Sequence, residues 1–585
     1  MLKTLGAQIK EFKKDSLLTP FFMILEVLME TIIPLMMASI IDDGVESGDI
    51  HHIYVMGGCM VIVACISLFA GTMGGKYGAK AATGFARNLR KAMYENIQTF
   101  SFSNIDKFST AGLVTRLTTD VTNIQNAYMM LLRMCVRSPI TLICAMIMAF
   151  FISPKLASIY LAAVILLGII LAIITLKAHH YFMEAFPKYD DLNASVQENV
   201  SAIRIVKAYV REDYEKKKFT TASQNIYRMF QKAESILAFN NPAMMLTVYT
   251  CIIAISWTGA KMIVGSTLTT GQLMSLLTYC MNIMMSLMML SMVFVMLTMS
   301  IASARRICEV LTETSDIVNP KNPVYEVSDG SIAFDHVTFR YNETSDTPVL
   351  SDINLSIASG ETIGIIGGTG SSKSSLVNLI SRLYDVNEGS VSVGGKDVRS
   401  YDLDTLRSEV SVVLQNNVLF SGTIYENLRW GDADATDEEC RRACALACAD
   451  EFIDRFPDGY DTYIEQGGSN VSGGQKQRLC IARALLKKPK ILILDDSTSA
   501  VDTATDAKIR RAFAEEIPNT TKLIIAQRIS SVQNADRIIV LNNGVIDGIG
   551  THEELLANNE IYRDVYESQT SGSGDFDEGG VSYAK

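Results

Sequence analysis

Long apolar stretches dominate the first half of the chain. They cover about residues 18–42, 53–75, 129–152, 155–177, 238–264 and 272–300. Each approaches or exceeds the ~20 residues that a helix needs to cross the hydrocarbon core of a bilayer. The pattern predicts a polytopic α-helical membrane domain over residues 1–302, with six spans and therefore with both ends on one side of the membrane.

Charged residues indicate which side that is. Four lysines precede the first span (Lys3, Lys10, Lys13 and Lys14), whereas residues 42–52 contain four acidic residues and no lysine or arginine. Basic residues favour the cytoplasmic side, so we expect a multi-pass plasma-membrane protein whose ends face the cytoplasm. The first run is too long for a signal peptide and is followed by further spans, so we expect it to be retained.

Two connections between the spans are long. Residues 76–128 and 178–237 are charged and compatible with helices, while the other connections are short. At ~1.5 Å per residue, helices in these segments would extend far beyond the headgroups. We therefore expect them to meet something on the cytoplasmic side.

The pattern changes after the sixth span. Residues 303–330, with Pro320 and Pro323, are typical of a linker, and residues 331–568 alternate strand-like and helix-like runs, which predicts an α/β domain. Residues 569–585 are rich in Gly, Ser and acidic residues, which is typical of a disordered tail. A net charge of 52 − 63 = −11 disfavours nucleic acid as a partner, and Cys440, Cys444 and Cys448 are best explained as small buried hydrophobes.

A phosphate-binding loop is the first chemical signal in the α/β domain. The strand-like ETIGIIG leads into GGTGSSKSS and then into the helical pattern LVNLISRLY. Backbone N–H groups of such a loop surround phosphates, a lysine reaches the β and γ phosphates, and a following serine ligates Mg²⁺. The candidates are Gly367, Gly368, Thr369, Gly370, Ser371, Ser372, Lys373, Ser374 and Ser375.

Two further motifs follow it. In ILILDD an apolar strand ends in Asp495, suited to Mg²⁺ binding directly or through water, and Asp496, which would lie beside the γ phosphate. In VSGGQ, the residues Ser472, Gly473, Gly474 and Gln475 form a second anion-binding helix start, for which this chain offers no obvious phosphate of its own. Taken singly, each motif is also compatible with an ordinary structural turn.

With these motifs in order, the chain resembles ATP-binding cassette (ABC) exporters that fuse six spans to one nucleotide-binding domain. The resemblance implies that ATP and Mg²⁺ are the cofactors, that Tyr341 stacks on adenine, that Gln415 lies near Mg²⁺ and that Asp502 belongs to the D-loop. It also implies that the two long segments couple the nucleotide domain to the spans. Since the family pairs two nucleotide domains head to tail, it further implies a second half-transporter as partner.

Three positions depart from the family's hydrolytic pattern. Asp496 replaces the usual glutamate, Gln527 replaces the switch histidine, and Ser372 replaces a glycine. An aspartate holds its carboxylate over an ångström further from the attacking water, and misplacement of that size can lower the rate about 10²-fold. Glutamine cannot supply an imidazolium-like charge, and a serine forced to φ > 0 costs about 1–2 kcal/mol.

These departures resemble the degenerate half of heterodimeric bacterial exporters. We expect low turnover at this chain's own Walker site and an intact signature that completes the hydrolytic site of the partner. The alternatives are a homodimeric lipid or peptide exporter and a non-transporting subunit that senses ATP.

The cargo is indicated only loosely. Met285 and Met289 belong to a methionine-rich span, and flexible methionines suit varied apolar or amphipathic ligands, although helix packing explains them as well. Glu26 with Glu30, and Arg133 with Arg137, place charges within spans; Glu30 lies about 12 residues, or ~18 Å, inward from Leu18. These charges either face an aqueous cavity that attracts cationic substrates or pair with one another.

Overall fold

The computed structural model describes residues 1–342, 347–497 and 500–571. The chain forms two compact units. The first contains Met1–Thr99 and Phe108–Glu313, and the second contains Phe100–Lys107 and Thr314–Lys585. Each unit is described by itself below.

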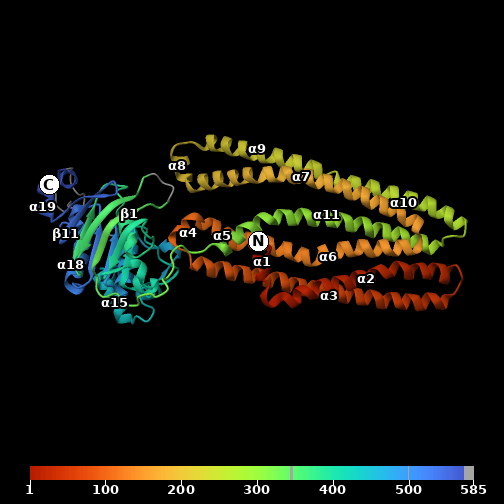
Figure 1. Cartoon of the computed structure of the whole chain (residues 1–585), viewed down its shortest axis with the longest axis horizontal. Helices are drawn as coiled ribbons and strands as arrows, with labels where there is room; N and C mark the ends of the chain where they lie inside the picture. The colour runs from red at the N-terminus through yellow and green to blue at the C-terminus, as the bar shows by residue number, and fades with distance from the viewer. Residues whose placement is uncertain (343–346, 498–499, 572–585) are drawn as a thin grey trace. The chain divides into compact units, whose positions relative to one another are not determined.

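The first unit is helical throughout (Figure 1). Its long helices are α2 (Lys13–Ser39), α3 (Ile50–Gln98), α6 (Val121–Ile152), α7 (Pro154–Ser201), α9 (Glu212–Leu237), α10 (Asn240–Val264) and α11 (Thr270–Thr312), and its short ones are α1 (Leu2–Ala7), α5 (Thr110–Thr115) and α8 (Ile203–Ala208). Within the described residues, six helical segments are long and apolar enough to cross a membrane: Lys10–Val45, Ile50–Gln98, Thr110–Ile152, Pro154–Ala178, Glu212–Val264 and Thr270–Thr312. The six predicted spans are confirmed.

Local sequence fixes where these helices begin. The Asp49 side chain accepts a hydrogen bond from the backbone N–H of His52 and caps α3, while Thr269 and Gln272 cap α11 reciprocally. Ser153 is extended, and Pro154 begins α7 at a position where its missing N–H has no cost. The predicted extensions are also helical, since α3 and α7 continue well past their apolar parts.

The second unit is an α/β domain, as predicted. Its central sheet has the order β12 (Val545–Gly550), β11 (Arg537–Asn542), β3 (Thr362–Ile366), β10 (Thr521–Ile525), β9 (Ile491–Asp495) and β6 (Val410–Val413). A second sheet has the order β2 (Leu350–Ile357), β1 (Ile332–Phe339), β4 (Glu388–Val393) and β5 (Lys396–Asp397). The inner strands β3, β9 and β10 are parallel to one another, and every residue of β9 and β10 is buried. Parallel strands therefore deliver their C-terminal residues to one edge, where nucleotide sites of such sheets lie.

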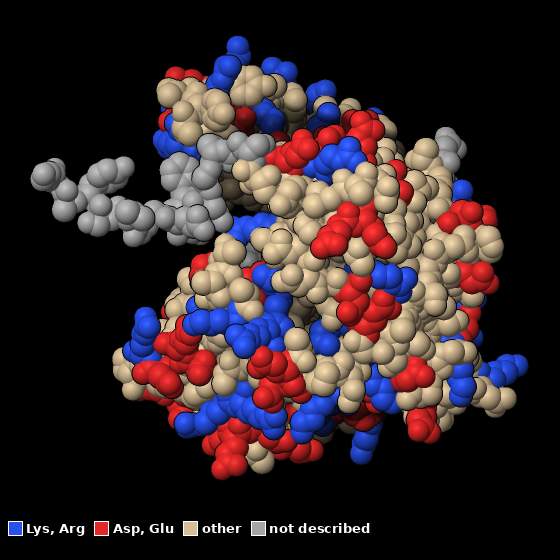
Figure 2. Space-filling model, turned by 90° about the vertical axis from the view of Figure 1, so that its left-hand side faces the viewer, with Lys and Arg blue, Asp and Glu red and all other residues tan. Residues whose placement is uncertain are grey.

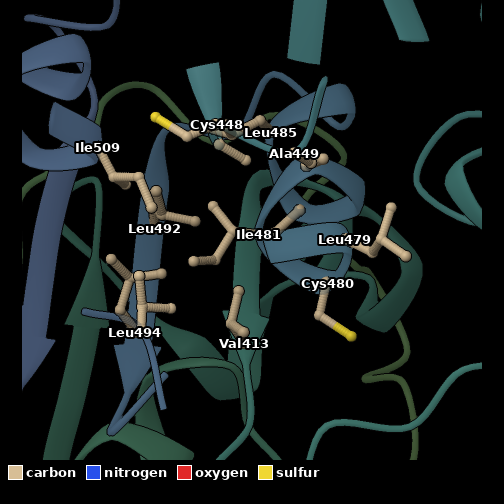
Figure 3. Close-up of a cluster of buried hydrophobic side chains, with 14 of the residues drawn as sticks. Val413, Cys448, Ala449, Leu479, Cys480, Ile481, Leu485, Leu492, Leu494 and Ile509 are labelled. Atoms are coloured by element: carbon tan, nitrogen blue, oxygen red, sulfur yellow. The ribbon is translucent and has the colours of Figure 1, made fainter. Parts of the chain in front are cut away.

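Helices complete this unit around the sheet. They include α12 (Lys373–Ile380), α15 (Asp437–Leu446), α17 (Gly473–Leu486), α18 (Thr503–Glu516), α19 (His552–Asn558) and α20 (Glu560–Ser571). Figure 3 shows Ile481 of α17 facing Leu492 and Leu494 of β9, within the hydrophobic cluster that fixes this helix. Cys440, Cys444 and Cys448 are buried in the same cluster, as predicted.

The predicted tail overlaps the end of this unit. Gln569 and the two residues after it still belong to α20, and the remainder of the tail lies outside the described residues. Acidic and basic side chains are interspersed over the face of the molecule drawn in Figure 2.

Candidate nucleotide-binding site

The predicted phosphate-binding loop joins β3 to α12. The Lys373 Nζ donates hydrogen bonds to the carbonyl oxygens of Gly367 and Gly368, each at 2.9 Å, and to Ser371 Oγ at 3.2 Å. A Cβ atom on Gly367 would lie 2.2 Å from the Leu541 carbonyl oxygen, so this position accepts only glycine, whereas a Cβ on Gly368 would meet nothing. The loop is thus held tightly on the sheet side and is open on the other side, next to the N-terminus of α12.

Ser372 sits in the left-handed region, with φ 73° and ψ 22°. The cost predicted from the sequence applies only if Ser372 has a positive φ, and Ser372 has one. A serine in this region costs about 1–2 kcal/mol. This strain lowers the stability of the fold.

Asp495 ends β9 beside this loop. Its side chain is buried and is hydrogen-bonded by Ser374, and burial raises the pKa of Asp495 above the ordinary aspartate value, with Asp496 adding to the effect. Burial also lowers the pKa of Lys373, which Asp495 and Asp496 partly oppose. The structure therefore brings together one amine, one hydroxyl and two carboxylates, as the sequence predicts.

Asp496 follows with φ 49°, another left-handed residue. Its Oδ2 accepts a hydrogen bond of 2.8 Å from Gln527 Nε2, and Gln415 also hydrogen-bonds its carboxylate. Burial raises the pKa of Asp496, and these two amides oppose the shift. The two residues that depart from the hydrolytic pattern, Asp496 and Gln527, are thus direct partners.

The oxygen ligands present here fit Mg²⁺ bound together with a triphosphate. The described residues contain no cluster of three or more His, Cys, Asp or Glu side chains that would hold a metal alone. The hydroxyl of Ser374, the carboxylate of Asp495 and the amide oxygen of Gln415 are the hard donors that Mg²⁺ accepts, with phosphate oxygens and water completing its shell. When bound, Mg²⁺ neutralises charge on the β and γ phosphates.

Tyr341 lies at the adjoining end of α12. Its hydroxyl shares a hydrogen bond of 2.8 Å with Ser375, and its ring is half exposed, which leaves a face for a purine. Tyr384, which the sequence did not single out, packs edge-on against Tyr341 at 5.0 Å and donates a hydrogen bond of 2.9 Å to Asp106 in α4 (Phe102–Lys107). No local motif marks Tyr384, because its role depends on a segment 278 residues away.

The signature residues begin α17. Ser472 is the N-cap, its Oγ accepts from the Gln475 N–H at 3.3 Å, and the Gln475 side chain accepts from the Ser472 N–H at 2.9 Å. A Cβ on Gly474 would lie 2.7 Å from the Ala500 carbonyl oxygen, so α17 and the D-loop are in close contact. Asp502 caps α18 by accepting from the Thr505 N–H at 2.9 Å, which lowers the pKa of Asp502.

Within the spans, the predicted charges pair unequally. Arg137 donates to Glu26 Oε1 at 2.9 Å and to both oxygens of Glu30 at 2.9 and 3.0 Å. Glu26 Oε2 and Arg133 Nε are buried and have no hydrogen-bond partner among the described residues. Arg137 alone therefore joins both carboxylates.

The methionine candidates lie on α11. Met285 is exposed and Met289 is half-buried. A hollow of about 350 Å³ opens between α7 and α11, with Thr175 and Ser291 among mainly apolar lining residues, and neither methionine is one of the described residues that line it.

Six apolar helical segments joined to a phosphate-binding α/β domain define a membrane transporter half. The ABC transporter transmembrane region matches residues 17–307, and the ABC transporter nucleotide domain matches residues 350–499. The chain belongs to the ABC transporter family, and it is built as an exporter half-transporter whose nucleotide domain binds ATP.

Several relatives extend this comparison. An uncharacterized ABC transporter ATP-binding protein of Bacillus subtilis, YfiB, is 37% identical over 94% of this chain and 96% of its own length. The probable multidrug resistance protein YheI of the same organism is 36% identical over 72% of both chains, and an ATP-dependent lipid A-core flippase of Syntrophus aciditrophicus is 33% identical over 88% and 84%. A bacterial Atm1-family ABC exporter with ATP bound has the same fold, with a TM-score of 0.83, 24% identity, and coverage of 95% of this chain and 99% of its own.

Proposed function

We propose that this chain is one subunit of a heterodimeric ATP-driven exporter and that its own Walker site holds ATP with little turnover. The observation that carries the proposal is the hydrogen bond of 2.8 Å between Gln527 and Asp496. It occupies one carboxylate oxygen of the residue at the position of the general base. The carboxylate is also one methylene shorter than that of glutamate, which places it further from an attacking water.

The remaining residues support binding of ATP more than its cleavage. Lys373 and the open loop provide charge and N–H donors for the phosphates, and Tyr341 offers a half-exposed ring to adenine. Gln527 can donate a hydrogen bond to the γ phosphate but cannot carry the positive charge that stabilises the transition state. The site therefore binds ATP firmly and hydrolyses it slowly.

The signature has none of these departures. Ser472, Gly473, Gly474 and Gln475 would bind the γ phosphate held by the partner subunit and complete a site with the partner's own catalytic glutamate. One full hydrolytic site per dimer would drive the export cycle, with ATP binding closing the nucleotide domains and turning the cavity outward.

We further propose that the cargo is an apolar or amphipathic small molecule. The hollow between α7 and α11 is mainly apolar and carries two hydroxyl groups, Thr175 and Ser291. Met285 and Met289 of α11 do not line it, but methionine side chains adapt to varied apolar ligands. A relative named for multidrug resistance supports this class. The Arg137 pairs with Glu26 and Glu30 favour a structural role for those charges, because both carboxylates already have a charged partner within the helices.

The test restores the missing groups in this chain. We would express it alone, reconstitute it in nanodiscs and compare its ATPase rate with that of the D496E/Q527H double variant and of the inactive K373A variant. We expect the double variant to be about 10²-fold faster than the unmodified chain. If the unmodified chain hydrolyses ATP as fast as the double variant, its site is not degenerate and a homodimeric exporter is the better description.

A further inference from the structure

The switch loop that carries Gln527 is held from the C-terminal helix α20. Gln569 Nε2 donates a hydrogen bond of 2.8 Å to the Gln527 carbonyl oxygen, and Gln569 Oε1 accepts one of 2.9 Å from the Ile529 N–H. One side chain thus joins the backbone on both sides of Arg528. A glutamine amide is suited to this because it offers a donor and an acceptor side by side.

The helix that presents Gln569 is firmly anchored. Tyr562 is fully buried and its hydroxyl shares a hydrogen bond of 2.7 Å with His552 Nδ1, and Val565 and Tyr566 pack against the hydrophobic core. Residues spaced at i, i+3, i+4 and i+7 lie on one helix face, so Gln569 continues the face of Tyr562, Val565 and Tyr566. A polar residue on this otherwise apolar face meets backbone groups instead of the core.

The opposite side of the loop is fixed by α18. Ser531 Oγ donates to Asp506 Oδ2 at 2.9 Å, and Arg510 donates to the Ser530 carbonyl oxygen at 2.9 Å. Ile529 is also held by burial of its side chain in the core. At the Gln527 carbonyl oxygen and the Ile529 N–H, the loop is bonded to α20 through Gln569, and the side chain of Gln527 reaches Asp496 from this backbone.

We infer that Gln569 is a positioning residue for the switch loop: it sets the backbone from which Gln527 acts on Asp496 and on the nucleotide. The inference rests on the role given to Gln527 under the proposed function. It assigns to α20 a task in nucleotide handling that lies outside the motifs of the site.

The test is a double-mutant cycle on the full chain, co-purified with its partner in nanodiscs. The measured quantity is the half-life of radiolabelled ATP retained after rapid gel filtration. We expect Q569A to shorten this half-life about tenfold, a change equivalent to about 1.4 kcal/mol. In the Q527A background, Q569A should change nothing further, because the side chain that it positions is absent.

Two variants sharpen the cycle. Q569E keeps the acceptor for the Ile529 N–H but sets an oxygen against the Gln527 carbonyl oxygen, so it should shorten retention at least as much as Q569A. S568A is the matched control, because the Ser568 hydroxyl is exposed and, among the described residues, donates only to the Val565 carbonyl oxygen of its own helix. S568A should leave the half-life unchanged.

Other outcomes overturn the inference. If Q569A shortens the half-life of retained ATP equally in the wild-type and Q527A backgrounds, Gln569 has a structural role only. The same conclusion follows if Q569A and S568A lose ATP retention and melting temperature to the same extent. Unchanged retention in both Q569A and Q569E would remove any role. Rapid turnover of ATP by the wild-type site would instead contradict the proposed function, and the same cycle read as kcat would still test Gln569.

Discussion

The nucleotide domain contains two groups of nucleotide-site residues, here called the Walker end and the signature end. They differ in how closely they match the hydrolytic pattern of the family. The Walker end, defined here as Ser372, Lys373, Asp495, Asp496 and Gln527, combines the phosphate-binding loop with three departures from the hydrolytic pattern, two of which meet in one hydrogen bond. The signature end, defined as Ser472–Gln475 with Ala500 and Asp502, has its helix caps satisfied and Gly474 closely packed. If the two ends bound the same ATP, loss of catalytic residues at the Walker end would make the signature residues dispensable. The intact signature end therefore favours two ATP sites, each shared between two subunits.

The largest expected effect is at the signature end. In Gly474→Ala the new Cβ would lie 2.7 Å from the Ala500 carbonyl oxygen, so either α17 or the D-loop must move. A displacement near 1 Å at a phosphate-binding helix start can reduce turnover about 10²-fold. We expect that loss in the ATPase rate of the co-purified complex.

Two other variants allow the signature end to be compared with the Walker end. In Gly473→Ala the Cβ would be 3.6 Å from the nearest atom, an ordinary contact, so the loss should be smaller. Asp496→Asn should change the complex's ATPase rate little, because the proposed function assigns little turnover to the Walker end. A larger loss in Asp496→Asn than in Gly474→Ala would reverse the assignment of the two ends.

The next effect is a pH dependence that separates the ends. Burial raises the pKa of Asp495 and of Asp496, whereas the Thr505 N–H lowers the pKa of Asp502. As the pH falls, the Walker carboxylates therefore take up protons before Asp502 does, and their interaction with Mg²⁺ weakens. We expect ATP affinity at the Walker end to fall by up to about tenfold per pH unit for each proton taken up.

Stability should follow the opposite sign at the two ends. The raised pKa values mean that ionised Asp495 and Asp496 oppose folding at neutral pH, and this cost decreases as they are protonated. The lowered pKa of Asp502 means that its cap stabilises the fold above the unfolded value of 3.8 and is lost only as the pH falls through the lower folded value. Fluorescent ATP-analogue titrations from pH 7.5 down to 4, with Asp496→Asn beside the wild type, would check the affinity; a flat profile in the wild type over this whole range would contradict it.

A smaller effect is expected from the cap of α18. Asp502→Ala removes the acceptor for the Thr505 N–H and should lower the free energy of unfolding by about 1 kcal/mol, whereas Asp502→Asn keeps a good cap and should be nearly neutral. Chemical denaturation of the two variants measures the difference. Equal losses in both would show that the charge of Asp502, and not its capping oxygen, is what the D-loop requires.

What the sequence could predict depended on how local the signal was. Six spans follow from the length of apolar runs, and the phosphate-binding loop from a strand, a glycine-rich segment and a helix in direct succession. From the sequence spacing alone, Arg133 and Arg137 were equally good partners for Glu26 and Glu30. Only the packing of the helices shows that Arg137 pairs with both carboxylates. Gln569 and Tyr384 carry no motif because each acts on a distant segment of the chain.

The smallest expected effect is that of replacing Ser372, which should change the stability of the fold and leave ATP affinity unchanged. Ser372→Gly removes the strain of a left-handed serine, about 1–2 kcal/mol, but the added freedom of glycine in the unfolded chain offsets about 0.4–1 kcal/mol of it. We expect a net gain of about 0.8 kcal/mol in unfolding free energy, between limits of about 0 and 1.6 kcal/mol. The ATP dissociation constant should not change if the loop keeps this conformation when ATP binds; calorimetric titration of the K373A variant gives the blank. If ATP binds more tightly to Ser372→Gly, the loop changes conformation when it takes up phosphate, and Ser372 weakens ATP binding as well as the stability of the fold.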